Sequence, residues 1–204
     1  MAKYIHKLLK ETLLDMMEAE PLDDISVVKL IRQTGINRKT FYNHYRGMTD
    51  LLCRILTDEC VAAMGWNVRM DNWSAGVERM MYAMCRQERF VRRIRESRYA
   101  APARMHVRSL FDAGVECIVQ SARSSYERQQ GRPVSLTERQ QKYLAHSCAS
   151  VLFSTLEEWF EGGRQEPIPE CVQLMEVLTN SSVWEGIRFF DSRNRGVPIP
   201  ALPG

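Results

Sequence analysis

The chain has 204 residues, of which 45% are hydrophobic and 26% are charged, and its formal net charge is +3. This composition is typical of a globular protein and excludes a disordered, collagen-like or low-complexity chain. No apolar run approaches the roughly 18 residues that a membrane-spanning helix needs, and the first twenty residues, MAKYIHKLLKETLLDMMEAE, lack the apolar centre of a signal peptide. We therefore expect a cytoplasmic protein with no membrane partner.

Apolar residues recur with the helical period along nearly the whole chain, and no stretch of more than a few residues alternates as a strand would. The sequence therefore predicts an all-α protein. Proline, glycine and polar capping residues mark the expected helix ends. The first expected helix ends before Pro21, and the next three cover 27–34, 38–45 and 50–68. A further helix lies between breaks at 72–74 and 101–102, and another follows it and ends before the loop 129–135. The last two expected helices cover 138–160 and 167–190.

Polar residues stand where three of these helices begin. Ser26, Asn37 and Thr137 are expected N-caps, because their side-chain oxygens can accept the unpaired N–H groups of a first helical turn. Gly35 suits the left-handed backbone with which helices often end. The two short helices on either side of Gly35 therefore predict a helix-turn-helix.

Residues 26–47, SVVKLIRQTGINRKTFYNHYRG, carry positive charge without any acid. A helix-turn-helix places the first turn of its second helix against base edges in the major groove, and cations nearby contact phosphates. Phe41 and Tyr45, four residues apart, are expected to lie in the core instead. A basic helix pair also occurs in proteins that never touch DNA. The candidate DNA-binding residues are Ser26, Asn37, Arg38, Lys39, Thr40, Tyr42, Asn43, His44 and Arg46.

The run GINRKTFYNHY, from Gly35 to Tyr45, followed by Leu51, resembles the DNA-binding signature of the tetracycline-repressor (TetR/AcrR) family of transcriptional regulators. The resemblance implies an all-α architecture with a helix-turn-helix DNA-binding domain at 1–48 and a helical effector-binding and dimerisation domain at 49–192. The Pro/Gly-rich composition of the last residues predicts a flexible tail at 193–204.

The family resemblance also implies a function. Such a regulator binds a palindromic site on double-stranded DNA as a homodimer and responds to a small-molecule effector, which the sequence does not identify. Repression is the commoner outcome in the family. A transcriptional activator, or a helical dimer whose vestigial head binds a protein partner, are the alternatives.

Two positions depart from the family pattern. Ile31 stands where the family favours a small residue, on the helix that packs against the recognition helix. Met48 stands in place of a lysine that commonly holds a phosphate, so that contact is either missing or supplied by Arg46.

Tryptophan and methionine residues are concentrated between positions 64 and 84. Methionine adapts to irregular shapes, so such a lining suits a pocket for varied apolar effectors, although an ordinary core has the same composition. The candidate pocket residues are Trp66, Trp73, Met80, Met81, Met84, Phe111 and Cys117.

The last two predicted helices resemble the family's dimerisation helices, which form a four-helix bundle across a two-fold axis. Their apolar stripes are wider than a thin helical body would hide by itself. The candidate dimerisation residues are Val151, Leu152, Trp159, Met175 and Leu178.

Residues 86–108 contain eight arginines and two glutamates. Such a run is usually a solvated face, but it can also bind an anionic ligand or contact DNA phosphates.

No sequence feature indicates an enzyme. The six cysteines and four histidines lack zinc-ligand spacing, and there is neither a Gly-rich phosphate loop nor a Gly-x-Ser-x-Gly elbow. We expect no catalytic residue, no metal site and no cofactor. The cysteines are best explained as small buried hydrophobes, with a redox sensor as the alternative.

Overall fold

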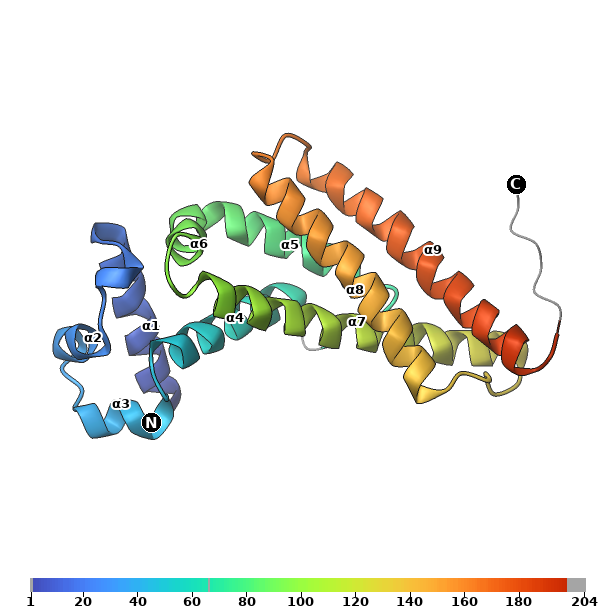
Figure 1. Cartoon of the computed structure of the whole chain (residues 1–204), viewed down its shortest axis with the longest axis horizontal. Coiled ribbons are helices and arrows are strands. Elements are labelled where there is room, and N and C mark those ends of the chain that lie inside the picture. The colour runs from blue at the N-terminus through green and yellow to red at the C-terminus, as the bar shows by residue number, and fades with distance from the viewer. Residues whose placement is uncertain (1, 66, 198–204) are drawn as a thin grey trace. The chain divides into compact units, whose positions relative to one another are not determined.

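The structure is a computed structural model that describes residues 2–65 and 67–197, and every regular element within them is a helix (Figure 1). The prediction of an all-α fold is confirmed. None of the described helices is long and apolar enough to cross a membrane. The elements are α1 (Ala2–Ala19), the 3-10 helix η1 (Leu22–Asp24), α2 (Val27–Thr34), α3 (Arg38–His44), α4 (Met48–Met64), α5 (Trp73–Arg86), α6 (Glu88–Arg95), α7 (Ala100–Gln130), α8 (Glu138–Glu161) and α9 (Ile168–Asn194).

The expected capping residues do begin and end helices. The hydroxyl of Ser26 accepts the N–H of Lys29, and Gly35 ends α2 with a left-handed φ of 72°. At α8, Thr137 and Gln140 form a capping box, in which each side chain bonds the other residue's backbone N–H. These caps fix the starts of α2 and α8 at the predicted residues.

Two predicted breaks are displaced. Pro102 lies in the first turn of α7 and does not interrupt a helix, because proline is tolerated where its missing N–H would have no partner. The interruption falls instead at 96–99, between α6 and α7, and a further break that the sequence did not predict occurs at Gln87, between α5 and α6. Helix α9 continues to Asn194, so the first two residues of the predicted flexible tail are helical, while 198–204 lie outside the described residues.

The chain divides into two compact units, and the division falls inside α4, α5 and α7. The first unit consists of the residues up to Ala62 together with Tyr82–Val107, and the second consists of Ala63–Met81 together with the residues from Arg108 onward. The first unit is thus larger than the predicted helix-turn-helix domain of residues 1–48. The division into a DNA-binding domain at 1–48 and an effector-binding and dimerisation domain at 49–192 stays a prediction.

One hydrophobic core holds the first unit together. It joins residues of the predicted helix-turn-helix with Phe90 and Ile94 of α6 and Ala103 of α7. Helix α6 therefore packs on α1 through its apolar face and is part of the same core as α2 and α3. The fully buried members of this core include Leu9, Leu13, Leu22, Ile25, Leu30, Phe41, Leu51 and Ile55.

In the second unit, α8 and α9 pack side by side along their length (Figure 1). Gly186 of α9 allows the close approach: an added Cβ there would lie 2.6 Å from Cδ1 of Leu144. Trp73 of α5 is fully buried and donates its indole N–H to Oδ1 of Asn180, at 3.1 Å. The side chains that α8 and α9 bury include Leu152, Phe153, Leu156, Trp159, Met175, Val183 and Ile187.

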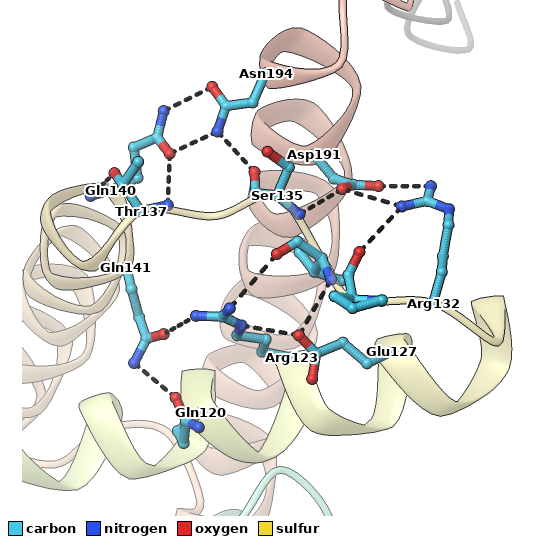
Figure 2. A network of polar contacts seen from close by, with 12 residues as sticks. Gln120, Arg123, Glu127, Arg132, Ser135, Thr137, Gln140, Gln141, Asp191 and Asn194 are labelled. Carbon is cyan, nitrogen blue, oxygen red and sulfur yellow. Dashed lines mark hydrogen bonds and ion pairs between the residues drawn. The ribbon is translucent and has the colours of Figure 1, made fainter.

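A polar network ties the loop between α7 and α8 to the neighbouring helices (Figure 2). Arg123 of α7 contacts Glu127 and also donates to Oε1 of Gln141, at 3.2 Å. At the other end of the network, Asp191 of α9 accepts from Arg132 and from the backbone N–H of Ser135. The loop is therefore held by defined polar contacts over most of its length.

Candidate nucleic-acid interface

Helices α2 and α3 and the turn between them form the predicted helix-turn-helix. Asn37 caps α3: its Oδ1 accepts the backbone N–H of Thr40 at 2.7 Å and the Thr40 hydroxyl at 2.9 Å. The backbone N–H of Tyr45 bonds the carbonyl oxygen of Phe41 and ends the helix. Helix α3 is thus bounded on both sides by local hydrogen bonds.

One face of α3 is anchored in the core. Phe41 is fully buried and Tyr45 is 8% exposed, so the expectation that both are core residues is confirmed. The remaining face carries the predicted DNA-binding side chains. Arg38, Lys39, Tyr42, Asn43 and His44 are exposed on α3, as are Ser26, Asn37 and Arg46 beside it, and Thr40 is half-buried.

Local contacts restrict what some of these side chains can do. The Thr40 hydroxyl donates to the side-chain oxygen of Asn37, which leaves the Asn37 amide NH₂ and the Thr40 methyl for a ligand. The guanidinium of Arg38 lies over the Tyr42 ring, 5.5 Å from its centroid. This cation–π contact favours a side chain of Arg38 that lies beside Tyr42, and both residues are exposed.

The cations of residues 26–47 are not equivalent. Lys29 pairs with Glu20 and is partly neutralised. The backbone N–H of Arg46 bonds Oδ2 of Asp50 at 3.0 Å, which leaves its exposed side chain outside that contact. Arg38 and Lys39 stand in the first turn of α3 and are exposed, so two cations lie where a recognition helix would meet DNA.

The two departures from the family pattern both have a packing role. Met48, at the start of α4, is 4% exposed and belongs to the core of the first unit. Ile31 is partly buried against the same core. A methionine side chain does not bind phosphate, so the prediction that the contact at position 48 is missing or is supplied by Arg46 stays open.

The arginine run 86–108 is not one solvated face. Arg89 pairs with Glu18 at the end of α1. The backbone N–H of Arg98 donates to Oδ1 of Asp23 at 3.0 Å. Arg108 belongs to the second unit, where it donates to the Ser150 hydroxyl. Sequence reasoning missed that α6 attaches to α1, because the buried Phe90 and Ile94 are a weak signal in so charged a segment.

The candidate pocket residues are spread over both units. Trp73, Met80 and Met81 are buried in the second unit, and Phe111 packs edge to face on Phe153, with ring centroids 5.5 Å apart. Met84 is half-buried and belongs to the first unit, and Cys117 is exposed. Trp66 lies outside the described residues. The pocket itself stays a prediction.

The candidate dimerisation residues divide into two groups. Leu152, Trp159 and Met175 are buried within the chain. Val151 is 50% exposed and Leu178 is 43% exposed. Only the second group is placed to meet another molecule. Sequence reasoning did not single out further exposed apolar side chains on the same two helices, namely Tyr143 on α8 and Leu174, Val177 and Phe189 on α9.

Burial makes most thiols poor candidates for chemistry. Cys148 and Cys171 are buried, and Cys117 is exposed. Burial raises the pKa of Cys60 to about 11 and that of Cys148 to about 11. A thiol with a raised pKa holds little thiolate near neutral pH, and the thiolate is the reactive form.

Comparison with known proteins identifies a similar fold but no family. No family model matches the chain, and no curated protein matches it in sequence. Among solved structures, the dihydroxyacetone kinase operon activator DhaS has a TM-score of 0.57 and 14% sequence identity, covering 87% of this chain and 95% of that chain. At this identity the likeness concerns the fold alone: the chain has an all-α fold similar to that of DhaS.

Proposed function

We propose that this protein is a DNA-binding transcriptional regulator. The observation that carries the proposal is the exposed face of α3, where Arg38 and Lys39 stand in the first turn, in a segment without acids from 26 to 47. Phosphate binding needs local positive charge, and base reading needs exposed polar side chains. The exposed face of α3 provides both. The similarity in fold to an operon activator supports the same function.

The side chains have different roles in this proposal. Arg38 offers two parallel N–H groups to a guanine edge, and the Thr40 methyl suits a thymine methyl. Lys39 and Arg46, together with the exposed His44 and the amide groups of Asn37 and Asn43, contact phosphates and set the position of α3 on the duplex.

The regulator acts as a homodimer through α8 and α9. Each helix carries exposed apolar residues at helical spacing, Tyr143 and Val151 on α8 and Leu174, Val177 and Leu178 on α9. Pairing these stripes across a two-fold axis would bury them in a four-helix bundle. Two recognition helices related by a two-fold axis require a palindromic site.

A small-molecule effector controls the regulator in this proposal. Such a ligand acts only if it binds one arrangement of the dimer better than the other. Repression is the leading outcome by family resemblance. Activation is favoured by one specific observation, namely that the similar solved structure is an operon activator.

The test begins with selection of binding sites from random double-stranded DNA. The selected site is then measured at two salt concentrations with the wild type and with the double variant Arg38→Ala/Lys39→Ala. We expect the variant to bind at least about tenfold more weakly, because one base contact and one phosphate contact are lost. Wild-type affinity is expected to fall steeply with salt as counterions compete.

A matched control removes the same charge elsewhere. Arg128→Ala/Arg139→Ala takes two exposed cations from the second unit and is expected to leave the affinity near that of the wild type. Equal losses in both double variants would mean that binding is unspecific attraction to a cationic protein. If no DNA sequence is selected, the proposal is rejected, and a helix-turn-helix that binds a protein partner is favoured instead.

A further inference from the structure

Helix α1 begins beside the end of α3. Nδ1 of His6 lies 2.6 Å from the hydroxyl oxygen of Tyr45, the residue that ends α3. Ile5, one residue earlier, is buried in the same core as Phe41 and Tyr45. In Figure 1 the start of α1 accordingly lies next to the end of α3. An element that precedes the helix-turn-helix in the sequence therefore borders it in the fold.

Contacts with α4 show which face of α1 lies at this border. Nε2 of His6 lies 2.9 Å from Oδ2 of Asp58 on α4. Lys10, one turn later on the same face of α1, pairs with Glu59 of α4. Lys3 stands three residues before His6, so it lies on this face as well and about 4.5 Å nearer to the start of the helix. Lys3 is therefore one helical turn from the residue that contacts the end of α3.

The first ten residues carry three lysines and no acid. Lys10 is compensated by Glu59. Nζ of Lys7 lies 3.7 Å from Oε1 of Glu11. Lys3 is exposed and forms no ion pair with any residue that the structure describes. Among the three lysines, Lys3 thus carries the charge that is most available to an anionic partner.

The acids on this side of α3 have other partners. Oδ2 of Asp50 accepts the backbone N–H of Arg46, at 3.0 Å. Oδ1 of Asp58 lies 3.4 Å from Nε of Arg54, and its other oxygen faces His6. These carboxylates are engaged by groups other than Lys3, so they do not tie its side chain to the protein.

A duplex bound to α3 would bring its backbone to this border. A helix with its side chains is about 10–12 Å thick and nearly fills a major groove that is about 12 Å wide. Elements beside a recognition helix therefore meet the phosphates that line the groove. At the end of α3, Met48 is buried in the core and offers phosphate no ligand. Arg46 and Lys3 are exposed cations at this end.

We propose that Lys3 contacts a DNA phosphate beside the end of α3, so that α1 forms part of the DNA interface. This inference rests on the proposed function. A phosphate contact carries no sequence information but fixes the position of the protein on the duplex. Lys3 therefore raises the affinity for every duplex and anchors the end of α3 on a side where Met48 supplies no contact.

The experiment measures affinity for the selected DNA by fluorescence anisotropy over a range of salt concentrations, with the wild type, Lys3→Gln and Lys3→Arg. We expect Lys3→Gln to bind several-fold more weakly at low salt and to reduce the slope of log affinity against log salt by about one, because one phosphate contact is lost. The preference for the selected site over unrelated DNA should stay the same. Lys3→Arg keeps the charge and should bind like the wild type.

The control removes one exposed cation at the other end of α1. Arg92 is exposed on α6, and α6 is attached there through the pair of Arg89 with Glu18. Lys3 and Glu18 lie near the two ends of the 18-residue helix α1, about 22 Å apart along its axis and further than the Debye length of about 10 Å at 0.1 M salt. Arg92→Gln should therefore leave both the affinity and the slope unchanged.

The outcomes separate this inference from the proposed function. If the wild type binds the selected DNA and Lys3→Gln keeps its affinity and slope, the role of Lys3 is overturned while the proposed function stands. Equal losses in Lys3→Gln and Arg92→Gln, or a loss that Lys3→Arg does not restore, also overturn it. Because Lys3 is exposed and unpaired, Lys3→Gln should unfold thermally like the wild type, and a lower midpoint would contradict a role in binding alone. Binding of no DNA by the wild type rejects both proposals.

Discussion

Arg132 and Asp191 form a two-point ion pair between the α7–α8 loop and α9, with Nη2 2.8 Å from Oδ2 and Nη1 3.3 Å from Oδ1 (Figure 2). Asp191 also accepts from Arg195 Nε at 2.8 Å and from the N–H of Ser135 at 2.7 Å. Burial acts to raise the pKa of Asp191, but the bonds from Arg132, Arg195 and Ser135 outweigh it and hold the pKa well below its usual range. A buried, charged carboxylate therefore fastens this loop to the end of α9.

Replacement of Asp191 by asparagine should destabilise the protein. Arg132 and Arg195 would lose their common counter-charge, and we expect a cost of about 2 kcal/mol, below that of a fully buried pair because both guanidinium groups are partly exposed. Urea unfolding measures the change. Glu185→Gln breaks an exposed ion pair with Arg188 and should cost less than about 0.5 kcal/mol. Equal costs would contradict the assigned role of Asp191.

The same carboxylate predicts how stability depends on pH. Because the pKa of Asp191 is lower in the folded than in the unfolded state, its contribution is complete above the unfolded value of about 3.9 and is lost as the pH falls below it. The difference in unfolding free energy between wild type and Asp191→Asn should therefore shrink from pH 5 toward pH 3. A difference that is constant over this interval would show that Asp191 is not charged in the fold.

Two substitutions of Asn37 should separate the stability of α3 from its charge. Asn37→Ala removes the cap and should cost about 1 kcal/mol of stability, with weaker DNA binding as the first turn frays. Asn37→Asp keeps an oxygen in the capping position but places a negative charge beside Arg38. It should unfold like the wild type and still bind DNA more weakly. Unfolding is followed by circular dichroism and DNA binding by fluorescence anisotropy.

The homodimer is tested by charging its proposed interface. Leu178→Glu would bury a carboxylate between two copies of α9, and we expect the sedimentation coefficient to change from that of a dimer to that of a monomer. Met105→Glu changes an exposed apolar residue of the first unit, 71% exposed, and should leave the dimer intact. A wild type that sediments as a monomer at all concentrations would exclude this interface.

Local signals made α2, α3 and their caps predictable from the sequence. Ser26, Gly35 and Asn37 act within their own helical turns, and such short-range chemistry is visible in a linear pattern. The burial of Phe41 and Tyr45 followed from spacing alone. The exposed basic face of α3 could be predicted from the same spacing. Once one side of a short amphipathic helix is buried, the residues on the opposite side must face the solvent.

Long-range contacts account for what the sequence did not predict. His6 and Tyr45 are 39 residues apart, and their bond depends on how α1 crosses the end of α3. Arg132 and Asp191 are 59 residues apart, and neither stands in a recognisable motif. The burial of Met48 likewise depends on the core around it. Periodicity identifies which face of a helix is apolar but not which helix will cover that face.

The core shared by α6 with the N-terminal helices has a consequence for how the protein is made. The first unit is encoded in two separate stretches, and Phe90, Ile94 and Ala103 come from the second of them. A ribosome must therefore translate Phe90, Ile94 and Ala103 before this unit can close its core. Until then, the nascent helix-turn-helix exposes apolar surface that α6 will later cover, and exposed apolar surface of this kind promotes aggregation.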